Sequence, residues 1–195
     1  PALIENGAAF NGSPMGPLET LDTISLETAY HGTQQRKADA EAAGGTWKPT
    51  PESDVICYMV EEAQRVGQAR GAGFYDYDGQ GKKVKTWDGL KDKFAPHGYS
   101  DMPFEDVRDR LLFSQVLEAI RIMEEGTLTS VADGNIGSIM GIGFPPHTGG
   151  VYQCVNAYGV QAFVDRAAIL AEKYGEAFEP PRLLLDMAAE GRTFA

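Results

Sequence analysis

Histidine is the side chain best suited to proton transfer near neutral pH, so its positions are a first guide to chemistry. The sequence contains three histidines, His31, His97 and His147, and none has a second His or Cys at metal-ligand spacing. His31 lies near the end of a predicted helical stretch, where the backbone dipole favours a cation. His147 lies in a turn and is the histidine best placed to face a cleft. The spacing predicts no metal site and favours structural roles over catalysis.

A glycine pattern is the second chemical candidate. Gly71-Ala72-Gly73 has the look of a phosphate-binding loop, and Arg70 stands directly before it. A dinucleotide-binding loop follows a parallel strand and opens a helix, and neither feature is predicted here. The glycines are therefore interpreted as a tight turn into a hairpin. Arg70 is either a contact for an anion or a surface arginine without a specific role.

Acidic pairs are the third candidate. Glu61-Glu62 and Glu124-Glu125 are adjacent in sequence. Adjacent residues point in different directions on a helix, so each pair is interpreted as a solvated face rather than an acid-base couple. No Ser, His and Asp combination of a nucleophilic enzyme is recognisable. We therefore predict that this chain contains no catalytic residue.

Charge and composition narrow the class of partner. The 195 residues are 43% hydrophobic and 23% charged, which is enough to build a sizeable core. A formal net charge of −11 argues against nucleic acid and anionic membranes as partners, because both carry negative phosphates. The charge still allows a local cationic pocket for an anionic small molecule.

Apolar runs and cysteines indicate the compartment. No apolar run approaches the ~20 residues that span a bilayer, so no integral membrane contact is expected. Cys57 and Cys154 lie inside apolar helical patterns and belong to no CxxC pair. They are interpreted as small buried thiols in a reducing compartment, which predicts a cytoplasmic protein.

The elements that position these residues are mostly helices. Apolar residues recur at three- and four-residue spacing, which is typical of amphipathic helices. Aromatic residues on both sides of Asp78-Gly79 predict one small β-hairpin. Residues 33–49 are interpreted as a polar surface excursion and residues 88–103 as a connector. The predicted helices cover residues 2–11, 17–32, 50–66, 104–125, 129–141, 151–174 and 182–190.

A glycine-proline turn occurs twice. The first copy is Gly12-Ser13-Pro14-Met15-Gly16-Pro17, and the second runs from Gly143 through Pro145-Pro146 to Gly150. Each follows an apolar helical stretch and precedes an amphipathic one, which predicts two modules, residues 1–90 and 100–195. The second module begins with a long helix, 104–125, for which the first has no counterpart. We therefore expect that the natural protein extends upstream of Pro1.

The motifs around these turns resemble the C-terminal domain of 3-hydroxyacyl-CoA dehydrogenases. In the first module the resemblance rests on residues 14–22 and on Gly71-Ala72-Gly73-Phe74-Tyr75-Asp76-Tyr77. The second module is similar to a second copy of that domain through Asp109-Arg110-Leu111-Leu112-Phe113, Glu124-Glu125-Gly126, Gly143-Phe144-Pro145-Pro146 and Thr148-Gly149-Gly150. Tandem copies of this kind are typical of the α-subunit of the multifunctional fatty-acid oxidation enzyme.

This resemblance implies a fold and an activity. The fold would be all-α, with two tandem modules like the C-terminal domain of 6-phosphogluconate dehydrogenase and one small hairpin. The complete enzyme would oxidise an L-3-hydroxyacyl-CoA to a 3-ketoacyl-CoA in β-oxidation, with NAD bound mainly by a Rossmann domain. In such proteins an enoyl-CoA hydratase domain and the Rossmann domain come first, and the family's catalytic His, Glu and Asn would all lie outside this chain. The isolated chain is expected to be inactive.

The resemblance also implies candidate binding residues. Pro14, Met15 and Pro17 match the turn that lines the acyl-CoA cleft, and an exposed methionine gives an adaptable apolar wall. Arg70 lies near the position where relatives place a cation by the NAD pyrophosphate. The alternative is that the turn only sets the angle between two helices.

A second function class is kept open. The chain could be a non-catalytic helical module for assembly or dimerisation, including docking to a thiolase subunit. A third reading, the helical half of a dehydrogenase for small hydroxy acids, predicts a single functional module, and the doubled turn argues against it.

Overall fold

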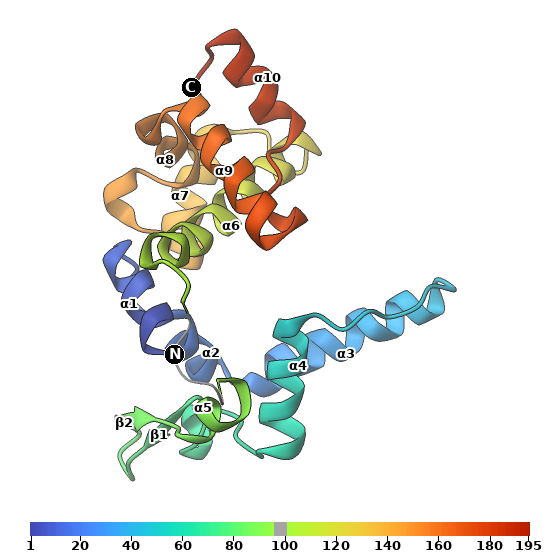
Figure 1. The fold of residues 1–195 in the computed structure, drawn as a ribbon, viewed down its shortest axis with the longest axis vertical. Helices are drawn as coiled ribbons and strands as arrows, with labels where there is room; N and C mark the ends of the chain where they lie inside the picture. Colours follow the sequence, from blue (N-terminus) through green and yellow to red (C-terminus); the bar gives the residue numbers. More distant parts are fainter. Residues whose placement is uncertain (96–100) are drawn as a thin grey trace. The chain divides into compact units, whose positions relative to one another are not determined.

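The computed structural model describes residues 1–95 and 101–195 of the chain. They divide into two compact units (Figure 1). The hairpin unit contains Pro17–Ser100 together with Pro1, and the long-helix unit contains Ala2–Gly16 and Asp101–Ala195. The repeat-based boundaries at 1–90 and 100–195 stay a prediction, because compact units and repeated modules divide a chain by different criteria.

The hairpin unit is built from short helices around one two-stranded sheet. Its elements are α2 (Pro17–Ile24), α3 (Leu26–Ala42), α4 (Pro51–Cys57), a π-helix (Tyr58–Glu62), a 3-10 helix (Gln68–Arg70), β1 (Tyr75–Tyr77), β2 (Lys83–Thr86) and α5 (Gly89–Phe94). The strands pair antiparallel, as the aromatic pattern predicted. The buried core consists of Leu26, Ile56, Met59, Phe74, Tyr75 and Leu90.

The predicted helix 17–32 is wrong in one respect, because the chain breaks at Ser25. Ser25 has φ 77°, its hydroxyl accepts the amide N–H of Glu27 at 3.2 Å, and it donates to the Val66 carbonyl at 3.1 Å. The amide N–H of Leu26 also donates to the Val66 carbonyl, at 2.9 Å. A helix end and a tertiary contact therefore coincide at a residue that periodicity treats as helical.

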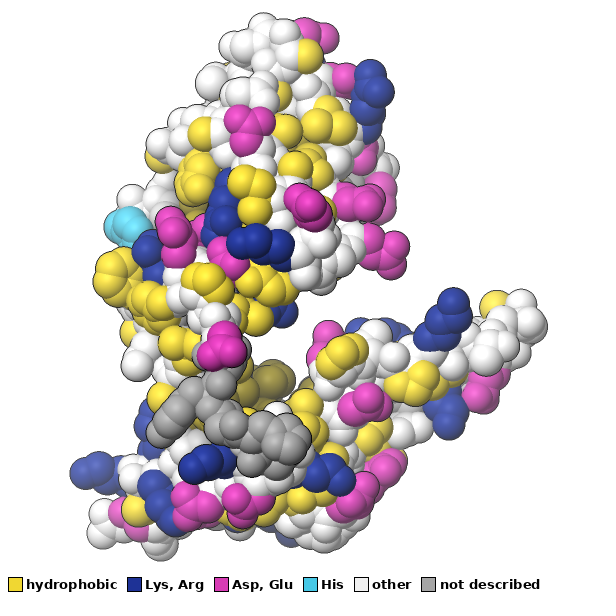
Figure 2. Space-filling model, viewed as in Figure 1, with side chains coloured by type: hydrophobic (Ala, Val, Ile, Leu, Met, Phe, Trp, Pro, Cys, Tyr) yellow, Lys and Arg dark blue, Asp and Glu magenta, His cyan; other side chains and the backbone are white. Residues whose placement is uncertain are grey.

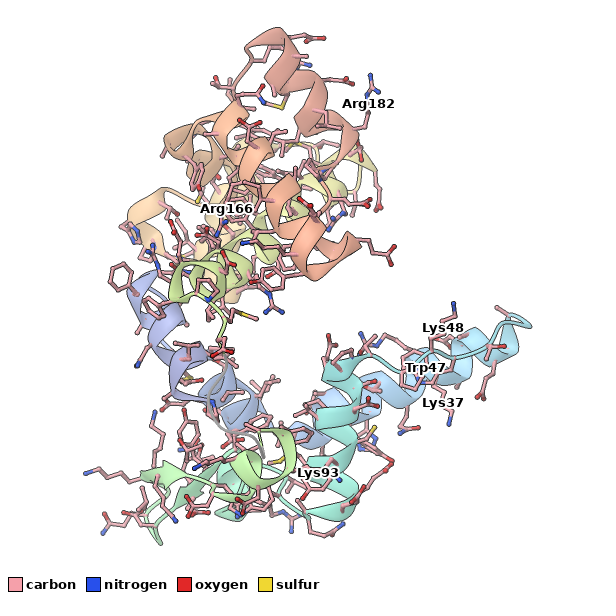
Figure 3. All side chains as sticks on the ribbon, in the orientation of Figure 1. Lys37, Trp47, Lys48, Lys93, Arg166 and Arg182 are labelled. Carbon is pink, nitrogen blue, oxygen red and sulfur yellow. The ribbon has the colours of Figure 1, made fainter. Side chains whose placement is uncertain are left out.

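The expected polar excursion 33–49 is helical in its first part. Helix α3 continues past Gly32 to Ala42 and projects from its unit as a long arm, along which Lys and Arg side chains lie (Figures 1 and 2). Alanines and long polar side chains are good helix formers even without an apolar stripe, so polarity alone did not identify a loop. Trp47 lies on the segment that runs back beside α3 (Figure 3).

Helix α4 begins as predicted. Thr50 caps it through a capping box with Ser53, whose amide N–H donates to the Thr50 hydroxyl at 3.2 Å. The regular helix ends at Cys57 rather than near Val66, and a π-helix continues to Glu62. The predicted connector 88–103 contains the short helix α5, and its residues 96–100, including His97, lie outside the described part.

The long-helix unit surrounds one 21-residue helix. Its elements are α1 (Ala2–Phe10), α6 (Phe104–Glu124), α7 (Val131–Ile142), a 3-10 helix (Pro146–Thr148), α8 (Val151–Tyr158), α9 (Val160–Tyr174), a 3-10 helix (Glu176–Phe178) and α10 (Arg182–Glu190). Helix α6 contacts α1, α8, α9 and α10, which confirms its predicted burial on more than one side. The rings of Phe113 and Phe163 stack at its centre, 3.9 Å apart.

The predicted helix 151–174 is two helices. Gly159 separates α8 from α9 with φ 93°, a conformation that side chains with a Cβ rarely adopt. The apolar spacing continues through this break because both helices face the same core. The part of the chain that the structure describes is thus helical with one small sheet, as predicted, and it contains no helix long and apolar enough to cross a membrane.

Candidate functional site

The first glycine-proline turn ends α1 in a left-handed conformation. Gly12 has φ 86°, and its amide N–H donates to the Ala9 carbonyl at 3.0 Å, while that of Ser13 donates to the Ala8 carbonyl at 3.0 Å. This is the hydrogen-bond pattern of a glycine-capped helix end. The next two residues, Pro14 and Met15, are exposed, and 42% of Met15 reaches solvent. The turn therefore presents an apolar pair on the surface of the long-helix unit.

The two copies of the turn contact each other. A Cβ placed on Gly12 would lie 3.7 Å from Cβ of Pro145 in the second copy. In return, a Cβ on Gly143 would lie 3.6 Å from Cγ of Pro14 in the first copy. Pro14 follows Gly12 by two positions, as Pro145 follows Gly143, so equivalent residues exchange contacts. Such an exchange is what a twofold axis produces at an interface between identical surfaces.

Arg70 lies at the end of the 3-10 helix of the hairpin unit. Its side chain is exposed and forms no hydrogen bond or ion pair with the described residues. A cation in this state is available to an anionic ligand. Pro17 opens α2 in the same unit, whereas Pro14 and Met15 belong to the long-helix unit. The four candidate residues are thus divided between the two units.

The glycines after Arg70 leave room for the buried carboxylate of Asp22. Asp22 of α2 is 1% exposed and accepts the amide N–H of Phe74 at 2.8 Å and that of Tyr75 at 3.0 Å. The Tyr77 hydroxyl donates to the same carboxylate at 2.9 Å. A Cβ on Gly73 would lie 2.1 Å from its Oδ1, so only glycine leaves room for Asp22. This finding confirms a structural turn rather than a phosphate loop.

The protonation of this buried cluster follows from its burial. Desolvation raises the pKa of Asp22 above its ordinary value, although the three donors and the nearby Arg65 oppose that shift. Burial and the bond to Asp22 also raise the pKa of Tyr77, so the hydroxyl keeps its proton and remains a donor.

Arg65 fixes the strand beside this cluster. Its guanidinium donates to the Gly73 carbonyl at 2.7 Å and to the Tyr75 carbonyl at 2.9 Å, and it pairs with Asp76 at 2.5 Å. The same group lies 4.7 Å from the ring centroid of Trp87. Sequence analysis did not identify Asp22 or Arg65 as site residues. A signal was present for Asp22, which lies one helical turn after Leu18, a partly buried residue packed against the core of the same unit.

A second charged cluster holds the long-helix unit together. Arg166 of α9 donates to Asp106 and to Asp109 of α6, each at 2.6 Å (Figure 3). The Tyr174 hydroxyl donates to Asp106 at 2.6 Å, and Lys173 lies 3.3 Å from it. The bonds from Tyr174 and Arg166 lower the pKa of Asp106 to about 2. This carboxylate is therefore ionised at neutral pH.

Neither cluster has the chemistry of a catalytic centre. The carboxylates of Asp22, Asp106 and Asp109 all accept hydrogen bonds from donors in their own unit, so none of them is placed as a free base for a substrate. Among residues 1–95 and 101–195, no group of His, Cys, Asp and Glu is arranged to hold a metal ion. His147 packs against Gly12, whose Cβ would lie 2.8 Å from the imidazole, so this histidine contributes to the contact between the turns. The Pro14–Met15 turn and Arg70 stay predicted binding residues.

Comparison with known proteins shows which family and which relatives this chain is similar to. Residues 1–77 match the family described as 3-hydroxyacyl-CoA dehydrogenase, C-terminal domain. The fatty acid oxidation complex subunit alpha of Acinetobacter baumannii (strain AYE) is 31% identical over 210 residues, and that of Pseudomonas syringae pv. tomato is 35% identical over 188. These matches cover 98% and 94% of this chain. Residues 1–77 are thus similar to the C-terminal domain of 3-hydroxyacyl-CoA dehydrogenases.

Solved structures share the fold over nearly the whole chain. The dehydrogenase part of multifunctional enzyme 1 from Caenorhabditis elegans has a TM-score of 0.66 at 20% identity and covers 95% of this chain and 41% of its own. The 3-hydroxybutyryl-CoA dehydrogenase from Escherichia coli K12 has a TM-score of 0.67 at 18% identity and covers 97% of this chain and 54% of its own. The chain spans only 28% and 25% of the Acinetobacter and Pseudomonas proteins.

Proposed function

We propose that this chain acts as the C-terminal helical part of an NAD-dependent 3-hydroxyacyl-CoA dehydrogenase of fatty-acid β-oxidation. The complete enzyme would oxidise an L-3-hydroxyacyl-CoA to a 3-ketoacyl-CoA. The observation that carries the proposal is the match of residues 1–77 to the family's C-terminal domain, joined to relatives that are named as fatty acid oxidation subunits.

NAD does not fit the described residues as a primary binding site. A dinucleotide loop needs glycines whose backbone is free to approach the pyrophosphate. In this chain the space above Gly73 is filled by the Asp22 carboxylate, and Gly71 ends a 3-10 helix. We therefore assign the main NAD site to a Rossmann domain elsewhere in the longer protein, with Arg70 as an additional contact to its phosphates.

The acyl-CoA contact is assigned to the first turn. Pro14 and Met15 form an exposed apolar pair on a backbone held by the glycine cap, and Pro17 opens the next helix with a fixed φ. A rigid turn bearing a flexible methionine suits an acyl chain, because the side chain adapts while its anchor stays in place. In this arrangement the chain shapes the substrate site, and the proton and hydride transfers occur on residues outside it.

The proposal is tested first on the chain alone. Purified residues 1–195, assayed with acetoacetyl-CoA and NADH, are expected to give no turnover. Measurable turnover that survives further purification would refute the assignment of catalysis to another part of the protein.

The second test uses the longer protein. Met15→Glu is expected to raise KM for a medium-chain 3-hydroxyacyl-CoA with little change in kcat, because it places a charge against an apolar chain. Ile169→Glu, at a residue 44% exposed on α9, is the matched control. Arg70→Gln is expected to raise KM for NAD alone, with Lys48→Gln as its control. Unchanged KM values in both test variants would remove the turn and Arg70 from the site.

The runner-up function is a helical assembly module. An exposed apolar face on α7 favours it as an additional role, and a thiolase subunit is the partner we propose for the complex. Deletion of residues 1–195 from the longer protein separates the roles. Loss of dehydrogenase turnover by the isolated subunit supports a contribution to the substrate site, whereas loss of subunit association alone supports assembly.

A further inference from the structure

Arg108 of α6 is fixed in place while its charged end is unused. Its Nε–H donates to the side-chain oxygen of Asn11 at 3.2 Å, and the Asn11 amide donates to the Arg108 carbonyl at 2.8 Å. The guanidinium also lies over the ring of Phe10, 4.2 Å from its centroid. Its two Nη groups form no hydrogen bond or ion pair with the described residues. These N–H donors are therefore held ready for an acceptor that the described part of the chain does not supply.

No carboxylate of residues 1–95 or 101–195 forms an ion pair with this guanidinium. Glu105 precedes Arg108 by three positions on α6, a spacing at which helical ion pairs form, but Asn11 and Phe10 engage the guanidinium instead. The neighbouring carboxylate of Asp109 is paired with Arg166 at 2.6 Å. On a chain of net charge −11, Arg108 is thus a local site for an anion. A planar guanidinium end suits the paired oxygens of a phosphate or carboxylate.

Phe10 supplies an aromatic surface beside this cation. Phe104 of α6 also contacts its ring, with centroids 5.9 Å apart and ring planes at 88°. With both contacts in place, Phe10 is still 66% exposed and Phe104 is 37% exposed. Exposed aromatic rings stack with the bases of nucleotides, whatever the base. A base therefore finds a stacking surface next to a group that binds phosphate.

The spacing of the two features matches one ligand better than two. The Phe10 ring and the Arg108 guanidinium are in direct contact, so a base on the ring and a phosphate on the Nη groups lie about one sugar apart. A phosphate monoester carries two charges and offers several oxygens, which makes it the better match for two unused Nη groups. An adenine nucleotide with a phosphate monoester has both parts.

These residues also adjoin the first turn. Asn11 directly precedes Gly12, and Met15 follows three residues later in the same compact unit. Under the proposed function, Met15 contacts the acyl chain of an acyl-CoA. CoA joins that chain through a flexible arm to an adenosine that carries a 3′-phosphate monoester. One thioester therefore has a group for each of the two surfaces.

We propose that Phe10, Asn11, Phe104 and Arg108, called here the Arg108 patch, bind the nucleotide end of CoA. Adenine stacks on Phe10, and the 3′-phosphate accepts hydrogen bonds from the Nη groups of Arg108. The inference rests on the proposed function, under which the longer protein acts on an acyl-CoA. NAD also contains adenine but has no phosphate monoester, so it is the weaker ligand of the patch. The patch contributes binding and orientation of the substrate, and it takes no part in the chemical step.

Equilibrium dialysis of purified residues 1–195 tests the ligand. We expect saturable binding of CoA, binding at least about tenfold weaker for 3′-dephospho-CoA, and binding weaker still for NAD. Binding of CoA is also expected to weaken as salt is raised, because an exposed charge pair is screened. Equal binding of CoA and 3′-dephospho-CoA, tighter binding of NAD, or no saturable binding of CoA would overturn the proposal.

Substitutions test the site. Arg108→Gln and Phe10→Leu are each expected to weaken CoA binding at least about tenfold, since the first removes the cation and the second the ring. Arg182→Gln and Ile136→Ala, at exposed positions of the same unit, are the matched controls and should leave binding unchanged. Arg108→Lys keeps the charge without the planar end, so it should bind CoA with intermediate affinity. Urea midpoints show that each variant is folded. Unchanged CoA binding in folded Arg108→Gln or Phe10→Leu would overturn the proposal.

The longer protein separates this inference from the proposed function. Arg108→Gln is expected to raise KM for a 3-hydroxyacyl-CoA severalfold with kcat unchanged. Wild-type turnover whose KM is insensitive to Arg108→Gln would refute the Arg108 patch alone. Binding of CoA that depends on Arg108, in a longer protein without dehydrogenase turnover, would refute the proposed function alone.

Discussion

The imidazole of His147 fills the space that a side chain on Gly12 would need. A Cβ on Gly12 would lie 2.8 Å from both Cε1 and Nδ1 of the His147 imidazole, closer than real Cβ contacts. Gly12 also has φ 86°. The glycine is thus required twice, once by its backbone and once by a side chain of the other turn.

Gly12→Ala is expected to destabilise the long-helix unit by more than its backbone strain alone. The φ contribution is about 1–2 kcal/mol, and displacement of His147 adds at least about 1 kcal/mol. Gly126→Ala is the matched control, because Gly126 has φ 76° and no atom within 4 Å of its Cβ. Urea unfolding followed by far-UV circular dichroism measures both variants. His147→Ala is expected to relieve the excess in Gly12→Ala, and equal losses in Gly12→Ala and Gly126→Ala would contradict the contact.

Tyr77→Phe is expected to destabilise the hairpin unit by about 1–2 kcal/mol, because it removes one of three donors to the buried Asp22 carboxylate. Both tryptophans, Trp47 and Trp87, belong to this unit, so tryptophan fluorescence in a urea titration reports on it selectively. Tyr30→Phe, which removes a hydroxyl bound to exposed Glu61, is the control and is expected to change stability by under about 0.5 kcal/mol. Similar effects of the two variants would count against a special role for Asp22.

Acid is expected to weaken the long-helix unit between about pH 4 and pH 2. Bonds from Tyr174 and Arg166 hold the pKa of Asp106 at about 2 in the folded state, against an ordinary value of 3.8. A carboxyl with a lowered folded pKa stabilises the fold above its unfolded pKa, and that stability is lost as pH falls through the folded pKa. Urea midpoints at pH 5, 4, 3 and 2 measure the loss. Asp106→Asn is expected to flatten this dependence, whereas Asp165→Asn at an exposed position should keep it.

Arg166→Met is expected to cost about 3–5 kcal/mol, because it leaves Asp106 and Asp109 buried without their shared cation. Arg182→Met is the matched control, since Arg182 is 79% exposed and pairs only within α10. Thermal unfolding by circular dichroism compares the two. A loss in Arg166→Met no larger than that of the control would mean that Asp106 and Asp109 are stabilised by other donors.

The two cysteines are expected to react with a thiol reagent at different rates. Burial raises the pKa of Cys154 to about 11, and the side chain is 6% exposed. Cys57 is only half-buried, although burial raises the pKa of its thiol too. At pH 8 we expect Cys57 to be modified first and Cys154 only on unfolding. Cys57→Ser and Cys154→Ser assign the phases, and rapid native labelling of Cys57→Ser would contradict this order.

Apolar periodicity predicted most helices of this fold, because burial of one face dictates spacing. The end of α6, the start of α4 and the extent of α10 all follow from such patterns and their caps. The breaks at Ser25 and Gly159 do not interrupt the spacing. They arise from a bond to Val66 and from a left-handed glycine, which depend on distant contacts or on a single dihedral angle.

The candidate site was less predictable than the fold. Exposure of Met15 and Arg70 follows from their positions in a turn and at a helix end. Sequence analysis did not identify Asp22 as a site residue. Its donors, Phe74, Tyr75 and Tyr77, lie more than fifty residues later and are brought to it only by the fold. The reciprocal contact between the two turns is visible only in the structure, although the repeated motif identifies both turns in the sequence.

The hairpin unit interrupts the sequence of the long-helix unit, so α1 is synthesised well before its partner α6. Asn11 donates to the Arg108 carbonyl at 2.8 Å, a partner 97 residues later in the chain. At ordinary rates of translation, α1 waits about 5–20 s for α6 to be synthesised. The hairpin unit is nearly continuous in sequence and can fold during that delay. The contact between α1 and α6 therefore forms only after residues 104–124 have been synthesised.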